Sequence, residues 1–282
     1  MEIRALTWNV YHGRDFPPDP SLRTKRSRLL RIRERNDTHL QVNRNLSRAF
    51  AELICTATWD VALLQECPPR WARRLAESCD ADAHRVLTSR NSYTPLRRLG
   101  AWLNPDLIGS NEGGSNLTLV RTAAAAILDR RAFTIRPGPV PERRTMAFTR
   151  LRLTHAEGGE VCVTNLHASA GWPLRAFAEE EVLLAAERSV EWAGDAPLIL
   201  GGDLNLRPAE TDVYDQLAER FGLRGTTAPD SLDHLLARNL EPVGRRAWTP
   251  QEREIHEEGL AIRLADHSPV ETTWALPAAP VG

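Results

Sequence analysis

The stretch L-I-L-G-G-D-L-N, residues 198–205, decides the fold class, because a short apolar run ends there in polar residues. Three aliphatic residues followed by two glycines are typical of a buried β-strand. Asp203 and Asn205 come at the end of this strand. A single Asn or Asp at the end of a strand is usually a turn residue. The stretch therefore indicates a functional site only if other strands of the chain also end in such polar residues.

The same design recurs at three other places in the chain. The run A-L-T-W ends in Asn9, V-A-L-L ends in Gln65 and Glu66, and V-C-V-T leads into N-L-H, which ends in His167. In open α/β sheets, ligands bind outside the carboxyl ends of the strands. We therefore expect the four strand ends to meet in one cleft.

Further elements follow from the pattern of apolar residues. Strands are predicted at 2–9, 60–65, 116–121, 123–128, 146–154, 160–167, 197–202, 232–237 and 270–275. Helices are predicted at 39–57, 68–79, 173–192 and 210–221, the first of them preceded by Thr38-x-x-Gln41, which is similar to a capping box. Strands that alternate with helices and also pair with one another predict an α/β fold, with mixed sheets covered by helices on both outer faces.

Composition places the chain among ordinary globular proteins. It has 282 residues, 42% of them hydrophobic and 26% charged, with a net charge of −1. The Pro- and Gly-rich segments predict loops within a single domain over residues 1–282, which we expect to be a monomer. No apolar run is long enough to span a membrane, and the N-terminus lacks the pattern of a secretory signal, so a cytoplasmic location is the default expectation.

The cysteines and the arginines bear on two further classes of protein, those with disulfides or a zinc site and those that bind nucleic acid. The four cysteines contain no C-x-x-C pair, which favours reduced, mostly buried thiols over disulfides or a zinc site: Cys55, Cys67, Cys79 and Cys162. Residues 23–35 carry seven basic side chains against one acid, and this stretch either grips a nucleic-acid backbone or forms a solvated face. Because Lys25 is the single lysine of the chain, an arginine cluster is weak support for either alternative.

Six short motifs occur in an order that resembles the endonuclease/exonuclease/phosphatase superfamily of metal-dependent phosphoesterases. They are T-W-N-V at 7–10, L-Q-E at 64–66, N-L-H at 165–167, G-D-L-N at 202–205, L-D-H-L-L at 232–236 and D-H-S-P-V at 266–270. Each motif alone is weak, but the ordered set at strand ends spans nearly the whole chain. The resemblance implies a four-layer α/β sandwich, in which two mixed β-sheets pack face to face with helices on both outer sides.

The resemblance also implies a role for each matching residue. Glu66 would be the main metal ligand, with Asn9 beside it and Asp266 as a further ligand or orienting acid. Asp203 would orient or deprotonate the attacking water. The phosphate-facing residues would be His267 paired with Asp233, together with His167, Asn205 and Asn116.

Other residues stay outside this predicted site. Glu112 is an alternative support for His167, because some relatives place an acid there. His12 follows T-W-N-V-Y closely, but we do not count it among the site residues. His234 is expected to pack along its strand.

The residue types suit phosphoester hydrolysis. A phosphodiester is anionic, so its hydrolysis needs positive charge on the oxygens, a positioned water and a proton for the leaving alkoxide. Carboxylate and amide oxygens are hard ligands that suit Mg²⁺, or Mn²⁺ as a substitute. Two histidines can move protons near neutral pH.

Departures from subfamily patterns limit the substrate. Abasic-site endonucleases carry N-G-[LI]-R after the first Asn, where this chain has N-V-Y-H, and inositol polyphosphate phosphatases carry a P-x-W-C-D-R segment that is missing here. N-L-H-A-S resembles DNase I-like and sphingomyelinase-like members. We predict a phosphodiesterase that acts on DNA or RNA. The alternatives are a phospholipid or small-molecule phosphoesterase of the same superfamily, and a binding module that has lost catalysis.

Overall fold

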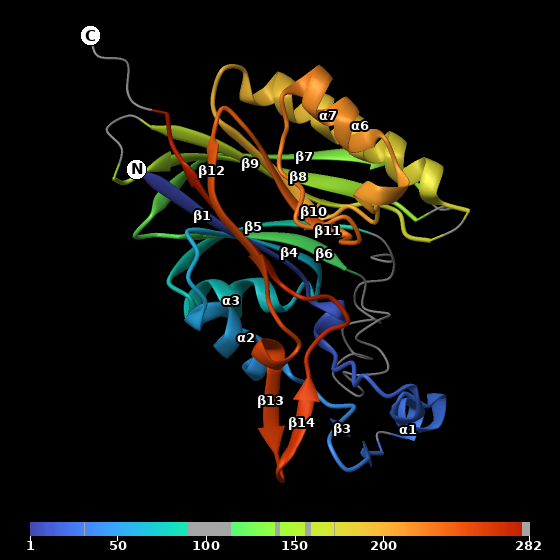
Figure 1. Cartoon of the computed structure of the whole chain (residues 1–282). Coiled ribbons are helices and arrows are strands. Elements are labelled where there is room, and N and C mark those ends of the chain that lie inside the picture. The colour runs from blue at the N-terminus through green and yellow to red at the C-terminus, as the bar shows by residue number, and fades with distance from the viewer. Residues whose placement is uncertain (31, 89–113, 139–141, 156–158, 172, 278–282) are drawn as a thin grey trace.

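Two large mixed β-sheets form the centre of the protein in the computed structural model, which describes residues 1–30, 32–88, 114–138, 142–155, 159–171 and 173–277 (Figure 1). The first sheet has the order β12 (Glu241–Ala247), β15 (Val270–Ala275), β1 (Glu2–Asn9), β4 (Val61–Cys67), β6 (Ser115–Arg121) and β5 (Ala81–Leu87). The second has the order β11 (Asp233–Arg238), β10 (Leu198–Asp203), β9 (Glu160–His167), β8 (Arg144–Leu153) and β7 (Ala125–Arg136). Each contains one parallel pair, β1 with β4 and β9 with β10.

Helices cover the outer face of each sheet. The helices α2 (Ser47–Thr56) and α3 (Trp71–Ser78) lie on the first sheet, and α6 (Arg175–Ala193) and α7 (Val213–Phe221) lie on the second (Figure 1). The expected four-layer α/β sandwich is therefore confirmed. None of the described helices has the length and apolar composition needed to cross a bilayer.

Smaller elements lie at the periphery. They are α1 (Lys25–Leu30) and two short hairpins, β2 (Glu34–Arg35) with β3 (Leu40–Gln41) and β13 (Glu254–Glu257) with β14 (Leu260–Arg263). Single 3₁₀ turns occur at Tyr11–Gly13, Pro20–Leu22, Pro208–Glu210 and Gln251–Arg253. The sequence did not predict β2, β3, β5, β12, β13 or β14. The fully exposed β12 carries Pro242 and Gly244 at the edge of its sheet, where strand propensity is weak.

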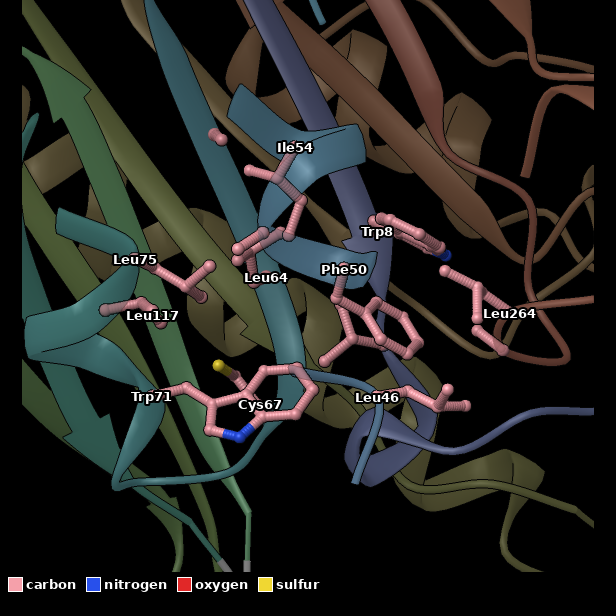
Figure 2. Close-up of a cluster of buried hydrophobic side chains, with 14 of the residues drawn as sticks. Trp8, Leu46, Phe50, Ile54, Leu64, Cys67, Trp71, Leu75, Leu117 and Leu264 are labelled. Carbon is pink, nitrogen blue, oxygen red and sulfur yellow. The ribbon is translucent and has the colours of Figure 1, made fainter. Parts of the chain in front are cut away.

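Alternation along the central strands sends apolar side chains to two different cores. Ile3 and Ala5 of β1 point between the sheets, whereas Leu6 and Trp8 point toward α2 and α3. Figure 2 shows the outer cluster, in which Phe50 stacks near Trp8 with ring centroids 5.0 Å apart. Each such side chain contributes about 1.5–3 kcal/mol when it is fully buried. Both faces of β1 are buried, which holds its carboxyl end in place.

Polar side chains also join the two sheets next to the carboxyl ends of the strands. Gln65 Nε2 of β4 donates to Asn165 Oδ1 of β9 over 2.8 Å, and Asn165 Nδ2 donates to the carbonyls of Leu64 and Leu117. All of these groups are buried, so their loss would leave unpaired polar atoms in the core. Asn165 of the N-L-H motif is thus a structural link that sets the spacing of the sheets near His167.

The predicted helix at 39–57 is too long. Residues 40–41 form β3, Asn43 has φ 48°, and α2 begins only at Ser47. Local polar groups explain the difference, because Asp15 Oδ2 accepts from the Val42 amide and Asn45 Oδ1 accepts from the Ser47 amide. The proposed capping box is also wrong: Asn36 Oδ1 accepts from the amides of Thr38 and His39.

Two of the cysteines form a disulfide, which corrects the expectation of reduced thiols. Cys55 at the end of α2 is bonded to Cys79 just after α3, while Cys67 and Cys162 are buried and are not part of this disulfide. The chain between the partners folds back through β4, so two cysteines far apart in sequence meet. Disulfides are typical of oxidising compartments, and the cytoplasmic location stays a prediction.

We expect the disulfide to stabilise the protein by ~3 kcal/mol, because the bond closes a loop with a sequence separation of 24. A reducing agent should lower the free energy of unfolding of the wild type by this amount. The double variant Cys55→Ser/Cys79→Ser should have the lower value with and without the reductant. Urea unfolding of both proteins measures this, and a wild type that is insensitive to reductant would contradict the bond.

A second stability prediction concerns His84 of β5, whose Nδ1 lies 2.9 Å from Thr149 Oγ1 of β8. Burial lowers the pKa of His84 to about 4. Between pH 6.5 and 4 the unfolded chain binds a proton at this imidazole while the native protein does not, so stability falls as the pH falls. We expect His84→Gln to remove a pH-dependent loss of ~3 kcal/mol over this window. The exposed His256→Gln is the control, and an unchanged pH dependence in His84→Gln would refute the prediction.

Candidate active site

The carboxyl ends of the two parallel strand pairs meet at one edge of the sandwich. Asn9 at the end of β1 donates through Nδ2 to Oδ2 of Asp203 at the end of β10, over 2.9 Å. This hydrogen bond crosses from the first sheet to the second. The parallel registers place Asn9 beside Gln65, and Asp203 beside His167, on neighbouring strands.

A glycine makes the approach of β10 to β9 possible. Gly202 has φ 138°, and a Cβ atom there would lie 1.8 Å from the carbonyl oxygen of Leu166. No side chain fits this position. Asp203 follows this glycine and lies at the end of β10. Its Oδ1 accepts a hydrogen bond from the amide of Asn205 over 3.1 Å.

Three predicted metal ligands lie on one side of the site. Glu66 sits in a bulge of β4 with φ 49°, and its carboxylate is partly exposed. Asp266 is mostly buried, and its Oδ1 has no hydrogen-bond partner among the described residues. Burial raises the pKa of Asp266, as does the negative charge of Glu66. Asn9 completes the group, with its Oδ1 accepting from the Tyr11 amide.

An acid–imidazole–acid series lies on the other side. His267 Nδ1 is 2.6 Å from Asp233 Oδ2, and its Nε2 is 3.8 Å from Asp203 Oδ2. The Nε1 of Trp8 donates to the backbone carbonyl of His267 over 3.0 Å and holds that turn. Asp203, Asp233 and His267 together bring one potential ligand atom each within 4.8 Å of one another.

The charges in this series shift the proton affinities strongly. Burial lowers the pKa of His267, but Asp203 and Asp233 outweigh it and raise the pKa to about 11. Burial raises the pKa of Asp203 to about 7, although the charge of His267 opposes that shift. The two acids therefore favour the protonated, positively charged form of the His267 ring. The short contact between His267 Nδ1 and Asp233 Oδ2 fits a hydrogen bond from the ring to this carboxylate, and a ring nitrogen that carries a proton cannot bind a metal ion.

His167 faces the same space from the end of β9. Its Nε2 is 3.6 Å from Asp203 Oδ2 and 3.9 Å from Glu66 Oε1. Its Nδ1 is 3.5 Å from Nη1 of Arg144, a buried guanidinium at the start of β8. Burial lowers the pKa of His167, and the charge of Arg144 lowers it further. The alternative support, Glu112, lies outside the described residues.

The remaining predicted residues lie around this centre. Asn205 has φ 53°, and its Nδ2 donates to the carbonyl of Ala168, directly after His167. Asn116 is buried on β6 opposite the bulge of β4, and its Nδ2 donates to the carbonyl of Thr145. The structure thus brings the eight residues from six strand or turn ends together, with Asn116 at the border: Asn9, Glu66, His167, Asp203, Asn205, Asp233, Asp266 and His267.

Two residues of the site were not predicted from the sequence. His12 Nε2 is 3.0 Å from Glu66 Oε2, although His12 was left out of the predicted site. Arg144 touches His167, and its buried Nε has no hydrogen-bond partner among the described residues. A signal existed for His12, which lies three residues after Asn9. None existed for Arg144, because arginines are frequent throughout the chain. His234, by contrast, bonds Thr227 and Ser231 and packs in the structure as expected.

The basic stretch of residues 23–35 is partly neutralised. Arg33 forms ion pairs with Glu257 and with Glu258, the latter at 3.1 Å, and both acids lie at the tip of the β13–β14 hairpin. The guanidinium of Arg23 stacks on Phe16, 4.2 Å from the ring centroid. Arg31 lies outside the described residues. These partners favour a structural role for this stretch over a free phosphate-binding surface.

Solved structures with the same architecture come from several organisms. An endonuclease/exonuclease/phosphatase family protein from Bacteroides thetaiotaomicron is 15% identical with a TM-score of 0.66, covering 99% of each chain. A mannosyl-6-phosphatase from the same organism is 15% identical with a TM-score of 0.64, covering 97% of this chain and all of the other. The catalytic domain of human Nocturnin, with bound sulfate, is 14% identical with a TM-score of 0.65, covering 98% of this chain and 95% of the other. At this identity the likeness concerns the fold alone, and no curated protein sequence matches.

The sandwich and the carboxylates and imidazoles at its strand ends fit the class of metal-dependent phosphoesterases, to which the matching family belongs. The family model described as Endonuclease/Exonuclease/phosphatase family matches residues 6–267. The chain belongs to this family, as its motifs predicted.

Proposed function

We propose that the protein hydrolyses phosphodiester bonds in nucleic acid with the help of a bound divalent cation, Mg²⁺ or Mn²⁺ as its substitute. The observation that carries the proposal is the hydrogen bond between Asn9 and Asp203, because it joins the predicted metal side to the predicted proton-transfer side across the two sheets. A phosphate placed between Glu66 and His267 would face charges of both signs. We further propose that the residues from 1 to 282 act as one domain and as a monomer.

The residues on the metal side fit a hard divalent cation. Glu66 and Asp266 offer carboxylate oxygens and Asn9 an amide oxygen, which are the ligand types that Mg²⁺ and Mn²⁺ favour. The unpartnered Oδ1 of Asp266 is an acceptor that needs a cation, a donor or water. When bound, the ion would supply Lewis acidity at a phosphate oxygen.

The other residues of the site would move the proton of the attacking water and donate hydrogen bonds to the phosphate. Asp203, with a pKa near neutrality, can accept a proton from the attacking water. The imidazolium of His267 can donate through Nε2 to a phosphate oxygen whose charge grows in the transition state. Asp233 holds the ring through Nδ1. His167 and the guanidinium of Arg144 bring further donors to the phosphate.

A small-molecule phosphoesterase is the second candidate. One observation favours it: Glu257 and Glu258 neutralise Arg33, which removes part of the surface expected to hold a nucleic-acid backbone. The chemistry at Glu66 and His267 would be the same.

A hydrolysis assay tests the proposal. Purified protein should hydrolyse bis-(p-nitrophenyl) phosphate and DNA or RNA with Mg²⁺ or Mn²⁺, and EDTA should stop the reaction. Turnover of p-nitrophenyl phosphate or of sugar phosphates alone would establish the second candidate instead. Nucleic-acid binding without metal dependence or turnover would replace both with a binding module.

A further inference from the structure

An imidazole and a carboxylate meet on the metal side of the site through two unusual backbone segments. His12 Nε2 lies 3.0 Å from Glu66 Oε2, with the side chains only 16% and 22% exposed. His12 has φ 53° and Glu66 has φ 49°, both in the left-handed region that non-glycine residues seldom adopt. Such conformations persist where the surrounding structure enforces them. The surrounding structure therefore holds both residues of this contact in fixed backbone conformations.

Comparison with a second imidazole–carboxylate pair shows what is particular about this one. His39 Nε2 lies 3.3 Å from Glu254 Oε1, and the same carboxylate oxygen accepts from Arg263 over 2.8 Å. That pair is already neutralised by a guanidinium. Among the described residues, the ion-pair partners of Glu66 are two imidazoles, His12 and His167, and no Arg or Lys. Its negative charge remains available to a cation.

The backbone keeps His12 in this place. The turn at Tyr11–Gly13 is held by the Tyr11 amide donating to Asn9 Oδ1 and by the Gly13 amide donating to the Val10 carbonyl over 2.7 Å. A Cβ atom on Gly13 would collide with the Trp71 ring at 2.2 Å, so the turn is packed tightly against α3. Asn9 thus helps to set the position of His12 while it lies beside Gln65, the residue before Glu66.

We propose that His12 supplies an imidazole nitrogen to the same divalent cation as Glu66, so that the site selects Mn²⁺ and later first-row ions over Mg²⁺. The inference rests on the proposed function and specifies its metal. Imidazole nitrogen binds transition ions well and Mg²⁺ poorly, whereas carboxylate oxygens serve both. A mixed nitrogen and oxygen donor set therefore raises the affinity for Mn²⁺ more than that for Mg²⁺.

Calorimetric titration of metal-free protein with Mn²⁺ or Mg²⁺ tests this without an activity readout. The variant His12→Asn suits the purpose, because Asn tolerates left-handed backbone and offers an oxygen in place of the nitrogen. Its Mn²⁺ affinity should fall by about tenfold or more, and its Mg²⁺ affinity should change by less than about threefold. The matched control is His39→Asn, which removes the imidazole of the His39–Glu254 pair outside the site and should leave both affinities unchanged.

Pulsed electron paramagnetic resonance supplies a second, independent measurement. Mn²⁺ bound to the wild type should show coupling to an imidazole ¹⁴N nucleus, and this coupling should disappear in His12→Asn. The inference is overturned if the wild type shows no such coupling, or if Mn²⁺ and Mg²⁺ affinities fall by the same factor in the variant. Either result leaves the proposed function standing, whereas a wild type that binds neither ion would overturn both.

Discussion

Replacement of Glu66 with Gln is expected to lower kcat/KM for bis-(p-nitrophenyl) phosphate by about a thousandfold or more, which corresponds to ~4 kcal/mol. Gln has nearly the same shape but no negative charge, so the variant loses the main proposed anchor of the cation while the bulge of β4 is kept. Steady-state kinetics with saturating Mg²⁺ or Mn²⁺ measures the effect.

Glu160→Gln is the matched control. Glu160 lies at the start of β9 and pairs with Arg150 over 3.0 Å, on a strand that ends in the site but at its opposite end. Its variant should keep the wild-type kcat/KM. Both variants should unfold within a few degrees of the wild type. If Glu66→Gln retains more than a tenth of the wild-type kcat/KM, Glu66 does not hold the cation.

His267→Ala should lower kcat by about a thousandfold, within the range found when a proton-transfer group is removed. The raised pKa of His267 keeps the ring charged at neutral pH, so the variant loses a positive donor aimed at the phosphate. It also leaves Asp203 and Asp233 without the positively charged ring of His267 between them. Single-turnover measurements at saturating substrate separate this loss from weaker binding.

Asp233→Asn and His155→Ala complete the experiment. Asp233→Asn keeps the ring of His267 but removes a negative partner, so kcat should fall by less than in His267→Ala. His155 is exposed outside the site, and its loss should change nothing. Equal kcat values in His267→Ala and the wild type would show that the imidazole has no part in turnover.

Local patterns predicted mixed sheets covered by helices, and the resemblance carried by the six ordered motifs added the four-layer sandwich. Runs such as residues 198–203 begin with apolar residues and end in residues that break strands. This pattern predicts a strand correctly because the burial of a strand depends mainly on its own side chains. The order of motifs then placed residues such as Glu66 and His267 in one site. Where polar side chains satisfied the backbone locally, as Asp15 and Asn45 do before α2, the same apolar spacing was wrongly interpreted as helical.

The sequence by itself determined the sandwich, its family, and the residues that its strand ends bring together. Only the tertiary structure decided that Cys55 bonds Cys79, that Arg144 touches His167, and that His12 meets Glu66. The physical reason is that these contacts join segments far apart in the chain and depend on backbone turns and sheet register. The type of a residue and of its neighbours in sequence does not predict such contacts.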